Sequence, residues 1–451
     1  MRSINTILGT AAVALAFCLP QQVGAQGPVS ISLQQALEMA AQQSYSVQTS
    51  VLEAEKARQK VKEITAIGLP QINGEASISN YIDVPTSLVP NFFVPEGPGV
   101  PPYIPAQFQV PWNVTGGLTL TQLLFDGSYL IGVKATRALE EQSQNDLERT
   151  RADARNQTAK AYYGVLAAQE GARLVNEGIP LLEKSLREVE AMMNAGFMEQ
   201  TDVDRLTIQV EDARVQKRNF EKQVDVARML LSFTLGIPQG TPLTLTDDLN
   251  TLIADPNESA LSEQAFDPGG HVELTSAKTL VTLSGYELRN EKMKYVPSLG
   301  GFVTHQQVWN GPEFDPGGTY SFYPTTLWGL KLSVPIFSSG SRAAKVRQAA
   351  ATLKQVEIHR TATEQRLIAD AERYRTQART ANDNLRNAER SMLLAKNIFE
   401  RTTVKFANGS AASFELTQEQ GNYLAAQQAY VMRVFELLSA RSELRKALDL
   451  Y

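Results

Sequence analysis

A seam of mostly apolar residues runs through the stretch from Leu367 to Phe406, in steps that alternate strictly between three and four residues. This period is typical of a helix that buries one narrow stripe in a coiled coil. The pattern also occurs 213 residues earlier (371 − 158), where every position but the first is apolar. The later seam is Ala371, Tyr374, Ala378, Ala381, Leu385, Ala388, Met392, Ala395, Phe399, Thr402 and Phe406, and the earlier one is Thr158, Ala161, Val165, Ala168, Ala172, Val175, Ile179, Leu182, Leu186, Val189 and Met193.

The two seams indicate that one long helix occurs twice in the chain. The same shift relates Gly340 to Gly127 and Gly409 to Gly196, so each copy lies between glycines that are 69 residues apart (196 − 127). At a rise of about 1.5 Å per residue, such a helix is roughly 100 Å long. A compact core has no use for a rod of that length, so we expect a function that involves spanning a distance.

The duplication also bears on how the 451 residues are divided, because it favours one architecture built from two halves over several separate domains. The formal net charge is −5. The chain has no basic block and no basic patch interleaved with aromatic residues, so we expect no nucleic-acid partner.

The residue types that enzymes use for chemistry are scattered. The histidines are His271, His305 and His359, far apart in the chain, and the single cysteine is Cys18. No glycine loop of the kind that holds phosphate is present, because Gly116-Gly117 and Gly300-Gly301 fall in expected strands. The sequence therefore predicts no catalytic residue, no cofactor and no metal site.

The N-terminus has the pattern of a secretory signal peptide over residues 1–25. Arg2 is the only early charge, an apolar core follows from Ile7 to Leu19, and Val23-Gly24-Ala25 is a small-residue cleavage site. Cys18 lies inside this signal, and the bulky Phe17 before it argues against lipidation. Beyond residue 26 no apolar run is long enough for a transmembrane helix, so a membrane span of this exported chain would have to be made of strands.

The expected elements follow the same order in both halves. The first repeat, 26–238, has a helix from Leu33 to about Ile67, strands at about 71–83 and 113–125, a long helix over 127–195 and a return helix over 201–235. The second repeat, 271–451, has a helix over 274–294, strands at about 299–309 and 326–337, a long helix over 340–408 and a return helix over 413–450. Residues 239–270 are a linker or equatorial segment, expected as a belt around the rods, and the proline-rich stretch 84–112 is expected as a surface loop.

The expected strands alternate apolar and polar residues over about ten positions, and aromatic residues lie at their ends. This pattern is typical of a transmembrane β-barrel wall, in which Tyr320, Phe322, Tyr323 and Trp328 would form an interfacial girdle in contact with outer-membrane lipid. Half-buried hairpins on a soluble core would give the same alternation, but the signal peptide favours the barrel. Because a barrel needs about eight strands or more, four strands per chain predict a barrel shared by several chains.

In this order the features resemble the TolC family of outer-membrane efflux proteins over the whole mature chain. The motifs that carry the resemblance are Gly68-Leu69-Pro70 and Val296-Pro297 before the strands, and Leu124-Phe125-Asp126-Gly127 and Ile336-Phe337-Ser338-Ser339-Gly340 before the long helices. The resemblance implies a homotrimer in which twelve strands form one barrel in the outer membrane, continued by an α-helical coiled-coil tunnel across the periplasm of a Gram-negative-type cell.

The resemblance also implies the partners. A periplasmic adaptor, or membrane fusion protein, and an inner-membrane pump would complete a tripartite efflux or type I secretion system, and the chain would passively conduct small molecules or proteins to the exterior. The small seam residues suit rods packed into a tunnel wall, but a simple antiparallel coiled coil uses the same pattern. The alternative function is therefore a periplasmic coiled-coil adaptor or structural protein that forms no pore.

The resemblance places the gate and the adaptor contacts at the two helix tips. Thr201 and Asp202 stand where the family has gate residues, whereas Phe406 and Ala411 replace a tyrosine and an arginine that make polar contacts in the best-known members. We therefore expect closure by apolar packing of Phe406 and Phe197. The tip turns expected to contact the adaptor are Gly196, Phe197, Gly409 and Ser410.

A constriction is expected next to the second tip. Glu415 stands where the family has a constricting carboxylate, and Gln418 replaces a second one a turn later. A symmetric ring of Glu415 side chains would favour cations. The simpler interpretation is a solvated helix start, where acidic side chains complement the helix dipole.

Overall fold

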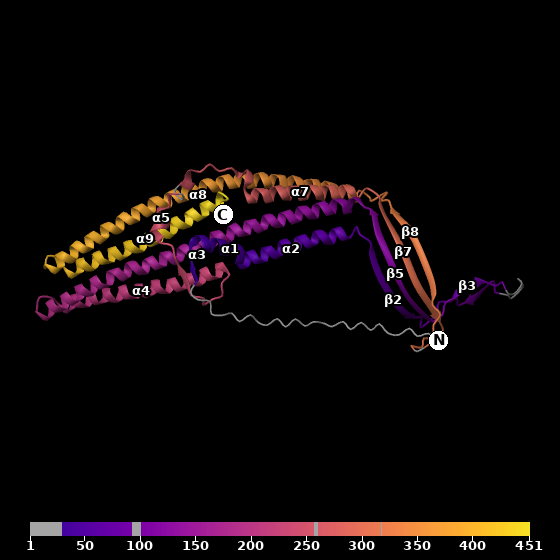
Figure 1. Ribbon diagram of the computed structural model, residues 1–451, viewed down its shortest axis with the longest axis horizontal. Helices are drawn as coiled ribbons and strands as arrows, with labels where there is room; N and C mark the ends of the chain where they lie inside the picture. Colours follow the sequence, from indigo (N-terminus) through magenta and orange to yellow (C-terminus); the bar gives the residue numbers. More distant parts are fainter. Residues whose placement is uncertain (1–28, 93–100, 257–259, 317) are drawn as a thin grey trace, which may run out of the picture.

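The computed structural model describes residues 29–92, 101–256, 260–316 and 318–451 of the chain. Figure 1 shows an elongated molecule with a sheet at one end and paired helices that run to two turns at the other. The predicted signal peptide, with Cys18, lies outside the described residues. Within the described residues, no helix has a segment both long enough and apolar enough to cross a membrane.

Four helices build the rods. The long helices are α3 (Gly127–Asn194) and α8 (Ser341–Ala407), and each turns back into a return helix, α4 (Gln200–Leu235) or α9 (Ser413–Ala447). Every position of the two seams is buried or half-buried. The α3 seam packs in a core with α4 and α9, and the α8 seam packs with α9. The period of three and four residues thus marks the buried faces of these rods.

One helix was predicted from Leu33 to about Ile67, and this is wrong. The structure has α1 (Leu33–Gln43) and α2 (Tyr45–Ala66), which meet at Ser44 in an extended conformation (ψ 145°). The Ser44 hydroxyl caps α2 by accepting a hydrogen bond from the Val47 N–H at 3.4 Å. The end of α4 packs against this break, because a Cβ on Gly236 would lie 2.2 Å from the Gln43 carbonyl oxygen. The matching helix of the second half, α7 (Val272–Met293), is continuous.

The four main strands form one antiparallel sheet in the order β2-β5-β7-β8. They are β2 (Gln71–Asn80), β5 (Trp112–Phe125), β7 (Ser298–Gly311) and β8 (Tyr323–Ser333). The last strand was predicted to reach residue 337, but it ends at Ser333, because Pro335 has no N–H to donate to a neighbouring strand.

The proline-rich stretch 84–112 was predicted to be a surface loop, and its described residues do lie at the surface, but they are not all irregular. It contains a two-stranded antiparallel hairpin of β3 (Ser87–Pro90) and β4 (Tyr103–Ala106). Figure 1 shows the hairpin projecting beyond the end of the sheet that is farthest from the rods. Prolines are compatible with such a ribbon, because the outer edge of each strand has no partner that needs an N–H.

A small belt lies beside the middle of the rods (Figure 1). It contains α5 (Leu249–Ala254), the 3-10 turns η1 (Leu261–Glu263) and η2 (Pro268–Gly270), and a two-stranded parallel sheet of β1 (Val29–Ile31) and β6 (Leu243–Leu245). The sequence predicted a segment of this kind over 239–270 but not that β1 would pair with it.

Tyr162 of α3 ties the belt to the rods. Its side chain is fully buried, and its hydroxyl contacts the Asp247 carboxylate at 2.9 Å and the Ile31 carbonyl oxygen at 3.1 Å. The same carboxylate accepts a hydrogen bond from the Leu33 N–H at 2.6 Å. Burial, reinforced by Asp247, raises the pKa of the Tyr162 hydroxyl above its ordinary value.

The substitution Tyr162→Phe should lower the free energy of unfolding by about 1–2 kcal/mol at neutral pH, because the Asp247 carboxylate loses a buried donor. A tyrosine whose pKa is raised on folding contributes stability below its unfolded pKa of about 10, and this contribution is lost as the pH rises above that value. The variant should therefore lose less stability than the parent at alkaline pH. Thermal unfolding followed by circular dichroism against pH checks both effects, with the half-exposed Tyr45→Phe as the control. Equal alkaline slopes in parent and variant would contradict the role given to Tyr162.

Candidate functional site

The strand register places the apolar residues of all four strands on one face of the sheet. Residues that face each other in antiparallel strands lie on the same side, and neighbours along a strand alternate sides. Ile72, Leu120, Val303 and Trp328 therefore share one level of one face. This apolar face contains Ile72, Ala76, Ile78, Val114, Leu118, Leu120, Leu299, Val303, Trp309, Trp328, Leu330 and Leu332.

The opposite, polar face presents mostly hydroxyls and amides. Thr119 and Thr304 contact each other across β5 and β7 at 3.2 Å. The polar face contains Asn73, Glu75, Ser77, Asn113, Thr115, Thr119, Thr121, Thr304, Gln306, Asn310, Thr325 and Lys331, with Phe302 and Leu327 among them. The apolar face in turn carries a few polar residues, among them His305 and Thr326, which contact each other at 2.8 Å.

Most of the apolar face is not covered by another part of the described chain, and only at its far end do Tyr320 and Phe314 pack against Trp309. Most of its large side chains are exposed, and Trp328 has 73 % of its surface accessible. A contiguous apolar area of this kind marks a surface that meets lipid or protein. The outer strands β2 and β8 each pair on one side only, so their other edges present backbone groups without partners in the sheet.

The four aromatic residues predicted to form a girdle are not brought onto one face. Trp328 lies on the apolar face, and Tyr323, which faces Val308, lies on the polar face. Tyr320 packs instead in a cluster with Trp309 and Phe314, at centroid distances of 4.5 and 5.6 Å. Trp112 joins this cluster by stacking on Phe314 at 5.4 Å, and Phe322 is 44 % exposed.

At the other end of the molecule, the two tips have the same backbone turn. Gly196 and Gly409 have φ values of +79° and +70°, a conformation that favours glycine. The N–H of Phe197 bonds to the Met192 carbonyl at 2.9 Å, and the N–H of Ser410 bonds to the Lys405 carbonyl at 2.8 Å. These are the six-to-one bonds of a Schellman cap.

Asp202 connects the two tips of one chain. The Ser413 hydroxyl, at the start of α9, donates to Asp202 Oδ1, and Arg205 Nη1 lies 4.0 Å from the same oxygen. The other oxygen, Oδ2, accepts from the Glu199 N–H at 3.3 Å. The predicted residue Thr201 is exposed and bonds to Glu199 at 3.2 Å. The polar contact between tips thus uses Ser413 and Arg205, which the sequence reasoning did not identify.

The expected packing of Phe406 against Phe197 is not formed within the chain. Phe406 has 1 % of its surface exposed and belongs to a cluster with Phe399, Leu416 and Val189. Phe197 is 83 % exposed at the first turn. Phe406 therefore packs in the interior of the tip, whereas Phe197 lies at the surface.

Glu415 and Gln418 lie in the first two turns of α9 and are both exposed. Gln418 Nε2 contacts Asn422 Oδ1 at 3.4 Å. Their exposure is compatible with a constriction built from several chains, and it equally fits an acidic helix start that complements the helix dipole.

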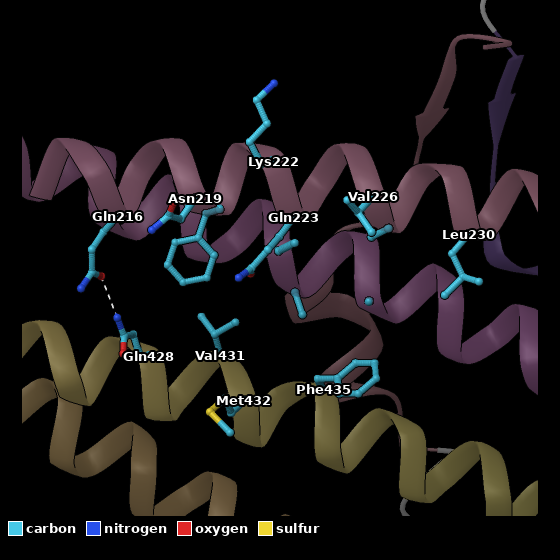
Figure 2. Close-up of a pocket in the computed structure, with 15 residues that line it drawn as sticks. Gln216, Asn219, Lys222, Gln223, Val226, Leu230, Gln428, Val431, Met432 and Phe435 are labelled. Carbon is cyan, nitrogen blue, oxygen red and sulfur yellow. Dashed lines mark hydrogen bonds between the residues drawn. The ribbon is translucent and has the colours of Figure 1, made fainter. Parts of the chain in front are cut away.

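A groove of about 780 Å³ lies between α4 and α9, above α3, partway along the rods. Figure 2 shows Gln216 and Gln428 joined across one end by a hydrogen bond of 2.7 Å, and Lys222 pointing away from the groove. Phe220, Val226, Leu230, Val431, Met432 and Phe435 supply most of its apolar lining. The rest of its lining includes the amide side chains of Gln216, Asn219, Gln223 and Gln428.

This chain is similar in sequence to known proteins. The family model described as "Outer membrane efflux protein" matches residues 36–237 and 287–449. Among curated relatives, the outer membrane efflux protein BepC of Brucella suis is 25 % identical over 250 residues, which is 54 % of this chain and 52 % of BepC. The proteases secretion protein PrtF of Dickeya chrysanthemi is 22 % identical over 284 residues, 62 % of this chain and 60 % of PrtF. The matched region thus spans between half and two thirds of these two relatives.

Solved structures share the fold over nearly the whole chain. CusC, described as forming a transmembrane channel, has a TM-score of 0.70 at 14 % identity, and the match covers 95 % of each chain. The outer membrane protein VceC of Vibrio cholerae has a TM-score of 0.66 at 15 % identity, covering 92 % of this chain and 95 % of VceC. The fold class predicted from the sequence, mainly helical rods with a smaller β part, is thereby confirmed.

Proposed function

Because this chain belongs to the outer membrane efflux protein family, we propose that it is the outer-membrane channel of a tripartite efflux or type I secretion system. In this role it passively conducts small molecules or proteins, which an inner-membrane pump and a periplasmic adaptor deliver, to the exterior. The family is one of channels, a kind of protein that is not enzymatic.

The observation that carries the proposal is the two-faced sheet with two unpaired edges. In hydrocarbon every backbone group needs a partner, so strands cross a membrane only in a closed barrel. Pairing β2 of one copy with β8 of the next closes the sheet, with the apolar face toward lipid and the polar face toward a water-filled lumen. Three copies would give twelve strands, and the paired rods would continue the lumen as a periplasmic tunnel.

The alternative of a periplasmic adaptor without a pore leaves this arrangement unexplained. A protein that stays in water gains nothing from a broad uncovered apolar face and two open strand edges. The choice between an efflux pump and a secretion system stays open, because one relative is named for efflux and the other for protease secretion.

Purified protein tests the proposal directly. A channel should appear in the outer-membrane fraction as an oligomer that resists dodecyl sulfate until it is heated, and it should conduct ions in planar lipid bilayers. An adaptor predicts neither property. Monomeric migration without heating, together with the absence of conductance, would refute the shared barrel.

The contact between Asp202 and Ser413 should help to keep the periplasmic end closed, because it fixes the start of α9 to the start of α4. The substitution Ser413→Ala removes the donor and should raise the bilayer conductance several-fold at low voltage. Ser410→Ala, in the exposed turn of the same tip, is the matched control and should leave conductance unchanged. If the two variants conduct alike, the Asp202–Ser413 contact plays no part in closure.

Glu415 should contribute to ion selectivity if three copies bring its exposed carboxylates into one ring. Glu415→Ala should then shift the reversal potential in a salt gradient toward lower cation selectivity. Glu419→Ala, one turn later on α9 and only half-exposed, serves as the control. An unchanged reversal potential would assign Glu415 to an ordinary solvated helix start.

A further inference from the structure

The β3–β4 hairpin is a module held together by its own backbone. Beside the strand pairing, the Asn91 N–H bonds to the Pro102 carbonyl at 3.0 Å, and Gln107 Nε2 donates to the Val84 carbonyl at 3.3 Å. None of its described residues, 84–92 and 101–112, is buried. A lone two-stranded ribbon is at best marginally stable in water, so the hairpin needs a surface to pack against.

One face of the hairpin is suited to such packing. Leu88 faces Pro105 and Pro90 faces Tyr103, so these four side chains lie on the same side. We call this surface the hairpin plate. Leu88 is 72 % exposed and Tyr103 is 56 % exposed. The other side carries Val89 and Ile104, which are half-buried.

The residue types of the hairpin limit the kinds of partner that it can bind. Residues 84–92 and 101–112 contain no acidic or basic side chain, and the nearest charged residues in the sequence are Asp83 before β3 and Glu96 between β3 and β4. The strands themselves therefore offer no charge to lipid headgroups or to a charged protein surface. Prolines at 85, 90, 101, 102, 105 and 111 remove N–H donors, which weakens strand addition at the hairpin edges. Face-to-face apolar packing is the mode of contact that remains.

The sheet order indicates where a second apolar surface comes to lie. The hairpin connects β2, an edge strand, with β5, and β2 ends at Asn80 at the same end of the sheet at which β8 begins at Tyr323. When β2 of one copy pairs with β8 of the next, the hairpin stands beside the start of the neighbour's β8. There Phe322 is 44 % exposed and Tyr323 is 69 % exposed.

We propose that the hairpin plate packs against Phe322 and Tyr323 of the next copy and so straps the junction between β2 and β8. The proposal rests on the shared barrel of the proposed function. It adds a contact beyond the strand pairing of the barrel, with a second copy of this chain as the partner, at the end of the sheet farthest from the rods.

Paired cysteines test the contact in the full-length protein. Cys18 is the only cysteine in the sequence, so in a Cys18→Ser background the double variant Leu88→Cys with Phe322→Cys should form covalent oligomers on mild oxidation. The matched control is Ser87→Cys with Phe322→Cys, because Ser87 is also exposed and adjacent but lies on the opposite side of β3. The plate variant should cross-link several-fold more than the control.

The outcomes distinguish failure of the shared barrel from failure of the hairpin contact. If the variants form no heat-sensitive oligomer even without oxidation, and the parent forms none either, the shared barrel itself fails. If the oligomer is intact but both cysteine pairs cross-link equally, the barrel stands and the strap is wrong. A fluorophore attached at Leu88→Cys in proteoliposomes adds a further check, since strong quenching by spin-labelled lipid would assign the plate to lipid and overturn the contact with a second copy.

Discussion

A sheet with one apolar face and two unpaired edges cannot remain alone in water. Burying a large aliphatic or aromatic side chain is worth about 1.5–3 kcal/mol, and the apolar face leaves Ile72, Leu118, Trp328 and several others exposed. The edges of β2 and β8 add backbone groups that need partners in any apolar medium. The strands have 10, 14, 14 and 11 residues, close to the length of about 9–11 residues with which a tilted strand crosses a bilayer. In the proposed barrel, lipid would cover the apolar face, and pairing between copies would provide partners for the two strand edges.

The parts of the fold that the sequence predicted are those in which burial is periodic. A helix that buries one stripe has an apolar residue at every third or fourth position, and a strand with two unlike faces has one at every second position. The β1–β6 pair could not be predicted in this way, because strands of three residues are too short to show a period. The break at Ser44 depends on where the end of α4 packs, as the close approach of Gly236 to Gln43 shows. The hairpin was not predicted, because the eight prolines in 84–112 favour a surface loop, although a ribbon with free edges also accepts them.

At the two helix tips, too, some features were predictable from the sequence and others were not. The turn glycines Gly196 and Gly409 were predictable because a positive φ selects for glycine. Ser413 and Arg205 were not, because their contact with Asp202 depends on how two distant helix starts are placed. The burial of Phe406 within one chain could also have been predicted. Phe406 is the last residue of the α8 seam, and the other seam positions are buried or half-buried as well.

The two coiled-coil pairs differ in the residues that the return helix buries near the tip. The core positions of α4 there are Val203, Leu206, Val210 and Ala213, all apolar. Gln420 of α9 is 1 % exposed, and neither atom of its amide has a partner among the described residues. Seven residues on, Gln427 donates to the Leu174 carbonyl of α3 at 3.4 Å, while its own oxygen is unpartnered. A buried amide without partners opposes folding, whereas buried aliphatic side chains favour it. Gln420 and Gln427 therefore stabilise the packing of α9 less than aliphatic residues would, although Leu416 of the same helix is fully buried. The contact of Ser413 with Asp202 thus adds a polar link between the starts of α9 and α4 next to this mixed core.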